Sequence, residues 1–491
     1  MLSPNLTDRI LPGKIKRILL VTSIAVVVIL LAVLYGREAK PLQAWHQVML
    51  DAEFSLDRAG TVASFADYLD LEERLFRQQD ELIYAHSDTG ISQAFNRYSP
   101  GSLADPRKHP INYNRSFELG ADAARGGVLL LHGMSDSPYS LRVIGNRLQA
   151  DGYRVVGLRL PGHGTIPSAL RHIRHRDMTA AVKLAMAHLE RQLPGKPLHI
   201  VGYSNGAALA IEYSLDVLDG ADGSLPASLV LISPALGIRA SARLASYLDT
   251  LSNLPGLEYW AYTDLGPEFD PFKYQSFAAN AADVVHSLTR SIKQRIEQRR
   301  ADAAALPPML VLKSTVDDTV TTDAVIDNLL EHLQAERHEL VLFDINRHSS
   351  AMSSIVINDP APFTNRVLNT VDAPFALTLV SNENDESLNL VSRYFAPRAR
   401  QPSRTESLGV AWPTDVVSLS HVALPFPPQD PLYGRHNPHT PGFIYLGRVV
   451  VQGERGLLQI SPNWLLRLRY NPFYDYLEGR SIDWINAATA G

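Results

Sequence analysis

The 491-residue sequence contains no cysteine, which excludes disulfide bonds, thiol nucleophiles and thiolate metal sites. It also lacks a strong excess of either charge, because 46 basic and 51 acidic side chains give a net charge of −5 at pH 7. A nucleic-acid-binding protein needs a basic face that neutralises phosphates, and this composition does not favour one. No nucleic-acid partner is therefore expected. Apolar residues make up 45% of the chain, enough for a sizeable core.

One long run near the N-terminus is free of charge: residues 18–35, ILLVTSIAVVVILLAVLY. As a helix this run would be about 27 Å long, close to the ~30 Å hydrocarbon core of a membrane. A cleaved signal peptide is the alternative, but the run is long for one, and no clear small-x-small cleavage site follows it. The sequence thus predicts an uncleaved transmembrane helix at residues 18–36.

Basic residues flank this run on both sides, at Lys14, Lys16 and Arg17 before it and at Arg37 and Lys40 after it. Once Arg9 is counted, the excess is slightly N-terminal. By the positive-inside rule, residues 1–17 are then a short cytoplasmic segment. The rest of the chain is expected outside the cytoplasm, at the inner membrane, with the catalytic domain in the periplasm.

Residues 37–120 combine helical patches with a loop and are interpreted as a lead-in packed on the main domain, residues 121–491. From residue 127 onward, strand patterns alternate with amphipathic stretches such as 178–192. The predicted strands are 127–131, 153–158, 198–201, 228–232, 309–313 and 339–343, with weaker signals at 375–380 and 416–420. This alternation predicts an α/β fold in which helices cover both faces of a mostly parallel sheet.

Two further segments interrupt the alternation. Residues 239–306 are predicted to form a helical cap that carries an aromatic cluster, namely Tyr259, Trp260, Tyr262, Phe269, Phe272, Tyr274 and Phe277. These rings suit either an apolar acyl chain or the interior of the cap itself. Residues 346–414 are interpreted as an insertion before the last strand, and a closing helix is expected at 464–485 with a break near Asn471.

The candidate nucleophile is Ser204, in the sequence Gly202-Tyr-Ser-Asn-Gly206. A G-x-S-x-G match alone is weak, but here a predicted strand leads into it and a helical stretch, 207–215, follows. A sharp strand-to-helix turn needs flanking glycines, because a Cβ there would clash with neighbouring backbone. The turn also places the hydroxyl at a helix N-terminus, where the dipole favours a developing anion.

Three motifs together resemble the α/β-hydrolase superfamily: LLLHGMSDSPYS (129–140), LRLPGHGTIP (158–167) and GYSNGA (202–207). They are most similar to the monoacylglycerol lipase, lysophospholipase and bacterial carboxylesterase group. The likeness covers residues ~127–235 and ~307–335, and the remainder resembles a membrane-anchored bacterial subgroup. In that fold, the backbone N–H groups of Met134 and Asn205 would form the oxyanion hole. His132, Gly133 and His163 would shape turns.

The acid and the base are less determined. The resemblance selects Asp317, after the predicted strand 309–313, over the neighbouring Asp318. Two histidines compete as base, and spacing from Asp317 favours His348. His421 is preferred because the closing helix lies downstream of it and because a proline-rich run (421–434) follows, which would hold the ring still. The segment 418–434 also resembles the bacterial subgroup.

The predicted function is hydrolysis of carboxylic esters, such as a lysophospholipid or a monoacylglycerol, by a Ser204–His421–Asp317 acyl-enzyme mechanism. No metal and no organic cofactor is expected. Two alternatives stay open: an aminopeptidase or amidase on the same scaffold, and a non-catalytic envelope protein that uses the fold for interaction.

Overall fold

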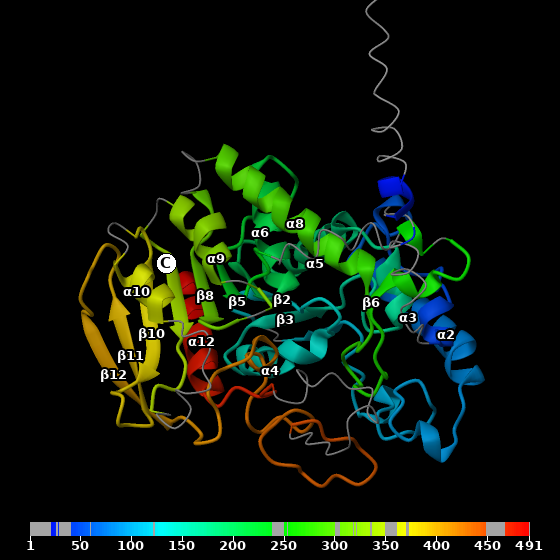
Figure 1. Ribbon diagram of the computed structural model, residues 1–491. Coiled ribbons are helices and arrows are strands. Elements are labelled where there is room, and N and C mark those ends of the chain that lie inside the picture. The colour runs from blue at the N-terminus through cyan, green and yellow to red at the C-terminus, as the bar shows by residue number, and fades with distance from the viewer. Residues whose placement is uncertain are drawn as a thin grey trace, which may run out of the picture.

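The computed structural model describes residues 21–25, 28, 41–58, 60–120, 123–237, 250–252, 254–299, 305–317, 319–320, 322–333, 336–348, 361–369, 373–447 and 467–490. Within these ranges a large twisted sheet runs through the molecule, and helices lie on both of its faces (Figure 1). The α/β class predicted from the alternation of strands and helices is confirmed.

The strands of this sheet lie in the order β1-β3-β2-β4-β5-β8-β9-β10-β11-β12. From β3 to β10 all neighbours are parallel, whereas β1, β11 and β12 pair antiparallel at the two edges. Their bounds are β1 Phe117–Leu119, β2 Gly127–Leu131, β3 Arg154–Leu158, β4 Leu198–Tyr203, β5 Ser228–Ile232, β8 Met309–Ser314, β9 Glu339–Phe343, β10 Ala376–Asn382, β11 Asn389–Phe395 and β12 Arg404–Ala411.

Two apolar layers hold the helices to the sheet, because successive strand residues face opposite sides. In β2, Leu129 and Leu131 belong to one layer, and Val128 and Leu130 to the other. The first layer packs against α3, α5, α6, α8, α9 and α10, and the second against α4 and α12. The helix bounds are α2 Ala44–Gln47, α3 Phe65–Leu82, α4 Arg142–Ala150, α5 His175–Gln192, α6 Asn205–Leu218, α8 Ala279–Gln298, α9 Thr322–Asn328, α10 Ala361–Asn369 and α12 Tyr474–Ala490.

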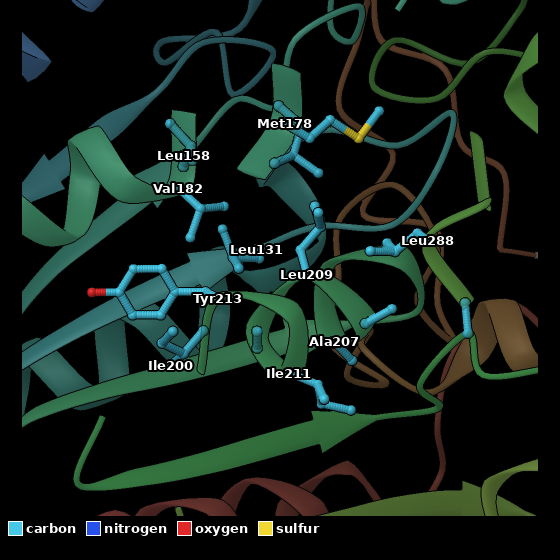
Figure 2. Packing of buried hydrophobic residues seen from close by; sticks show 14 of the residues in the cluster. Leu131, Leu158, Met178, Val182, Ile200, Ala207, Leu209, Ile211, Tyr213 and Leu288 are labelled. Atoms are coloured by element: carbon cyan, nitrogen blue, oxygen red, sulfur yellow. The ribbon is translucent and has the colours of Figure 1, made fainter. Parts of the chain in front are cut away.

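Helix α6 sits at the centre of the first layer. Figure 2 shows its side chains Leu209 and Ile211 among residues of strands β2 and β4, including Leu131 and Ile200. Gly206 allows this close packing, since a Cβ on it would lie 2.1 Å from the carbonyl oxygen of Leu131. Ser204 therefore lies between a central strand of the sheet, β4, and a helix that packs tightly on the sheet, α6.

The lead-in packs on the main domain through α3 and a buried arginine. Ser64 caps α3 by accepting a hydrogen bond from the Asp67 backbone N–H. Arg159, which follows β3, donates from Nε to Glu72 (3.0 Å) and pairs with Glu53 (3.1 Å). Arg159 is only 1% exposed, so its buried charge requires ion-pair partners. Both partners come from the lead-in, and the ion pairs therefore hold the lead-in against the sheet.

The cap region contains α8 and a short antiparallel pair, β6 Tyr262–Asp264 and β7 Phe277–Ala278. Most rings of the predicted aromatic cluster are buried, among them Tyr259, Tyr262 and Tyr274. Burial of this kind favours the interpretation that they form the interior of the cap. Part of the cap, residues 238–249, lies outside the described residues.

The strand predicted at 416–420 is wrong, and the segment 346–414 differs from the expected insertion. Both edges of β9 are already paired, with β8 and β10, so residues 416–420 cannot join the sheet beside it. Instead Asn346 holds them through two hydrogen bonds, to the carbonyl oxygens of Val416 (3.1 Å) and Val417 (2.7 Å). Strands β10, β11 and β12, all within 346–414, extend the main sheet.

The closing helix begins later than expected, at Tyr474, after the break at Asn471. The predicted transmembrane segment falls mostly outside the described residues, and of its length only 21–25 and 28 are described, as helix. Among the described helices none combines the length and apolarity that a membrane crossing requires.

Candidate active site

Ser204 occupies the tight turn that the sequence predicts between β4 and α6. Its backbone has φ 54° and ψ −114°, a conformation that L-residues other than glycine rarely adopt. The Ser204 N–H donates to the Ile232 carbonyl at the end of β5 (2.9 Å), which fixes the turn. A Cβ on Gly202 would lie 2.5 Å from the Ala207 Cα, so the glycine before the serine is required by contact.

The two predicted oxyanion donors lie on either side of this turn. Asn205 is the first residue of α6, and Met134 follows Gly133 in the loop after β2. A Cβ on Gly133 would lie 3.3 Å from the Ser204 Cβ, so this loop runs directly beside the nucleophile. Within the described chain neither the Met134 nor the Asn205 backbone N–H donates a hydrogen bond. Both amides are available for a developing oxyanion.

The two histidines that the sequence assigns to neighbouring turns, His132 and His163, make hydrogen bonds with backbone groups of the turns after β2 and β3. His132 accepts a hydrogen bond from the Leu160 N–H at Nε2 (3.0 Å), which joins the turn after β2 to the turn after β3. The His163 ring lies edge-on to it at 5.0 Å and contacts the Pro161 carbonyl. Burial lowers the pKa of His132 well below its usual value and that of His163 to about 4, so both rings are neutral.

Asp317 lies in the turn after β8 and is buried. Its Oδ1 accepts the backbone N–H groups of Thr319 (2.9 Å) and Val320 (3.0 Å), which orient the carboxylate. Burial alone would raise the pKa of Asp317, but positive charge on His421 and Lys313 holds it well below its usual range. The alternative acid, Asp318, lies outside the described residues.

The structure brings His421 to Asp317, and it does not bring His348 there. The His421 Nδ1 lies 2.9 Å from the Asp317 Oδ2, and its backbone carbonyl accepts the Tyr203 hydroxyl (3.2 Å). His348 is half-buried, and its backbone N–H donates to the Asn346 side chain (3.3 Å). Within the described residues His348 has no hydrogen bond to Asp317 or Ser204.

Ser204 is 8% exposed, and its hydroxyl makes no hydrogen bond to the described residues. In structures without substrate, the hydrogen bond between a nucleophile and its base is often long or poorly aligned, and it tightens when the substrate binds. The turn, the two free amides and the imidazole–carboxylate pair together can perform nucleophilic attack on a carbonyl carbon.

The loop that carries His421 is anchored by residues that sequence reasoning missed. Asp430 accepts hydrogen bonds at Oδ1 from the Leu432 and Tyr433 N–H groups and from the Tyr139 hydroxyl. Its Oδ2 pairs with Arg142 at 2.7 Å, and both side chains are buried. The sequence indicates only the prolines of this run, because a buried Asp with a distant Arg partner leaves no local sequence signal.

Two other missed residues contact Asp317 directly. Lys313, the fifth residue of β8, places its Nζ 2.7 Å from the Asp317 Oδ2, and the Ser233 hydroxyl donates to the same oxygen. Lys313 is fully buried in a strand whose other buried residues from Met309 to Leu312 are apolar. That one charge in an otherwise apolar strand is the signal that could have identified it.

A pocket opens next to the His421 loop. Its apolar walls are Val422, Phe426 and Tyr433, and its charged lining consists of Asp270, Lys273, Arg467 and Arg469. Asp270 accepts the Tyr433 hydroxyl at 2.7 Å. The lining has three cations and one anion beside these apolar walls, which suits a molecule with an apolar part and a polar or negatively charged part.

Comparisons with known proteins agree with this geometry at the level of family. Residues 128–363 match the model of a family described as the alpha/beta hydrolase family. The thermostable monoacylglycerol lipase of Bacillus sp. strain H-257 is 28% identical over 132 residues, which are 26% of this chain and 50% of the lipase. The chain thus spans about half the length of this curated relative.

Solved structures of lipolytic enzymes are also similar to part of the chain. A structure reported for the metagenome-derived lipolytic enzymes LipS and LipT is 20% identical, with a TM-score of 0.38, and covers 48% of this chain and 89% of its own. A soluble variant of the monoglyceride lipase from Saccharomyces cerevisiae is 14% identical, with a TM-score of 0.37, and covers 47% and 82%.

Proposed function

We propose that the protein, whose residues 128–363 match the model of the alpha/beta hydrolase family, is a membrane-anchored serine hydrolase that cleaves carboxylic esters through Ser204, His421 and Asp317. The observation that carries the proposal is the imidazole–carboxylate contact of 2.9 Å between His421 and Asp317, at the same end of the sheet as the strained Ser204 turn. The curated relative, a monoacylglycerol lipase, supports an ester or lipid substrate.

In the proposed reaction, the Ser204 Oγ attacks the ester carbonyl carbon while His421 Nε2 takes the hydroxyl proton. The carbonyl oxygen becomes an oxyanion that accepts the N–H groups of Met134 and Asn205. The carbon–oxygen bond to the alcohol then breaks, and the imidazolium returns its proton to the leaving oxygen. Asp317 keeps the Nδ1–H tautomer and stabilises the imidazolium. Water, activated by the same histidine, hydrolyses the acyl-enzyme.

Three variants test the assignment by their rates on a p-nitrophenyl acyl ester. Ser204→Ala and His421→Ala should each lower kcat at least about 10³-fold, because either change removes a member of the proton-transfer pair. His348→Ala is the matched control and should keep kcat within about twofold. The thermal midpoints of all three should stay within a few degrees. Full activity of His421→Ala together with loss in His348→Ala would transfer the base to His348.

The competing functions give different results. A fluorophosphonate probe should label the wild type and not Ser204→Ala, whereas a non-catalytic interaction protein would remain unlabelled. An aminopeptidase would turn over an aminoacyl-amide faster than the acyl ester.

The membrane anchor proposed at residues 18–36 places the hydrolase domain outside the cytoplasm. It is supported by the length and apolarity of the run and by the basic residues before it. The full chain should fractionate with the membrane, and a chain that begins at residue 41 should not. Equal distribution of the two would contradict the anchor.

A further inference from the structure

We infer that Lys313 is a positioning residue that sets the pH range in which the proposed base works, and that Ser233 orients Asp317 beside it. The inference rests on the proposed function and concerns a feature beyond a Ser-His-Asp arrangement. Asp317 Oδ2 receives the His421 Nδ1–H at 2.9 Å, the Lys313 ammonium at 2.7 Å and the Ser233 hydroxyl. One carboxylate oxygen thus serves the imidazole and a buried cation at once.

The hydrogen-bond partners of Lys313 indicate that its amine is charged. An ammonium group has three donors and no acceptor. The Lys313 Nζ lies within hydrogen-bond distance of Asp317 Oδ2 (2.7 Å), the Val320 carbonyl (2.9 Å) and the Ser233 Oγ (3.2 Å). The Ser233 hydrogen is directed to Asp317, so its oxygen can accept from the lysine. Burial lowers the pKa of Lys313, and the charge of Asp317 opposes that effect.

Ser233 is held in place by its backbone. It directly follows β5 and has φ 48°, a left-handed conformation that costs about 1 kcal/mol in a non-glycine residue. Its N–H donates to the Leu312 carbonyl in β8 (2.8 Å), beside Lys313. The hydroxyl is therefore aimed at Asp317 and lies 3.0 Å from the His421 Nδ1. Ser233 and Lys313 thus donate to lone pairs of Asp317 Oδ2 that would otherwise be open to other donors.

The charge of Lys313 should shift the balance between imidazole and imidazolium. The Lys313 Nζ and the His421 Nδ1 both lie within 3 Å of one oxygen. The lysine offsets part of the negative charge of Asp317 that would otherwise favour a positive charge on the ring. Without Lys313, the unshared carboxylate would stabilise the imidazolium more strongly and the acid limb of the rate profile would move to higher pH.

The other groups that face the imidazole do not reproduce this effect. The Tyr203 ring centroid lies 5.2 Å from that of His421, and burial raises the pKa of Tyr203 well above 10, so it stays neutral. Asp136 and Arg467 interact electrostatically with Tyr203 and act in opposite directions. Among the described residues, Lys313 is the cation that contacts the same carboxylate oxygen, Asp317 Oδ2, as the imidazole does.

The test is the pH dependence of kcat/KM, and of the rate of fluorophosphonate labelling, for Lys313→Met and Lys313→Gln. Both variants remove the charge, and the amide of glutamine keeps hydrogen bonds to the carboxylate, so it remains usable should the methionine variant fold poorly. Each should move the midpoint of the acid limb upward by about one pH unit or more, because a positive charge near the imidazolium is lost. KM should change less than twofold, because Lys313 lies away from bulk solvent and substrate.

Two controls separate the possible outcomes. Lys293→Met removes an exposed lysine of α8 and should leave the acid limb unchanged. Ser233→Ala keeps the ion pair and should lower kcat severalfold with the limb in place. If the wild type is active and both Lys313 variants keep the midpoint of the acid limb within 0.3 pH unit of the wild-type value (about twofold in proton concentration), the inference alone is overturned. A wild type that neither labels nor hydrolyses esters would overturn the proposed function and the inference with it.

Discussion

At the scale of single residues, Gly206 shows how little space separates the nucleophile turn from the sheet. We predict that Gly206→Ala destabilises the protein by about 1–3 kcal/mol or more, because the added Cβ would lie 2.1 Å from the Leu131 oxygen and force α6 away from β2. Esterase activity should fall as well, since the same shift separates the Ser204 hydroxyl from the Met134 amide.

The matched control for this change is Gly479→Ala. Gly479 lies within α12, and a Cβ there would meet nothing within 4 Å. In a helix this substitution should be neutral or stabilise by about 0.5–1 kcal/mol. Urea unfolding of both variants measures the difference, and equal stability of the two would contradict the close contact.

Also at this scale, the candidate site could be predicted from sequence only where a short pattern accompanies the chemistry. Ser204 and its glycines form such a pattern, and Asp317 follows a strongly apolar strand. His421 was preferred on indirect grounds, while Lys313 and Ser233 were missed. Their roles depend on contacts between β5 and β8, whose residues lie 80 positions apart in the chain.

At the scale of elements, the loop from His421 to Gly434 depends on the buried pair of Asp430 and Arg142. We predict that Asp430→Asn destabilises the protein by about 3 kcal/mol, because the Arg142 charge would remain buried without its partner. Since this loop carries His421, kcat should fall more than KM changes. Chemical unfolding and steady-state rates on a p-nitrophenyl ester measure the two effects.

A surface ion pair provides the comparison. Asp323 pairs with Arg366, and both side chains are more than half exposed. Asp323→Asn should therefore cost less than about 1 kcal/mol and leave kcat unchanged. A similar loss in both variants would mean that burial of the Asp430 pair is not the cause.

Elements themselves were predicted unevenly. The strands 127–131, 228–232 and 339–343 were predicted with correct bounds, because each is a short run of apolar residues that lies in the buried middle of the sheet. Strands β11 and β12 were missed. Both lie toward the edge, and β12 is almost entirely exposed, so its residues carry little of the apolar pattern on which the prediction rests.

At the scale of the whole molecule, buried histidines should make stability sensitive to mild acid. Burial lowers the pKa to about 4 for five histidines in separate regions: His46, His109, His163, His199 and His338. In the unfolded chain their pKa is about 6.5. Between those values the unfolded chain binds protons that the folded chain does not, so falling pH favours unfolding.

We predict that the free energy of unfolding falls by on the order of 1 kcal/mol per histidine for each pH unit below about 6.5. Glu268 acts in the opposite direction, because burial raises its pKa to about 7 and its neutral form is favoured in acid. Urea titrations at pH 7.5, 6.5 and 5.5 measure the net slope. His199→Gln should reduce that slope, whereas a stability that is constant over this range would contradict the prediction.

The last strand of the sheet, β12, has a neighbour on one side only, and its exposed face carries the paired charges of Arg404 and Glu406. Removal of the β11–β12 hairpin would leave β10 as the border, with the buried side chains Leu377 and Leu379 beside an unsatisfied ladder of amides and carbonyls. Such a border would be a template for self-association between molecules. The hairpin therefore also covers the edge of β10 against pairing with a strand of another molecule, a role unconnected with chemistry at Ser204.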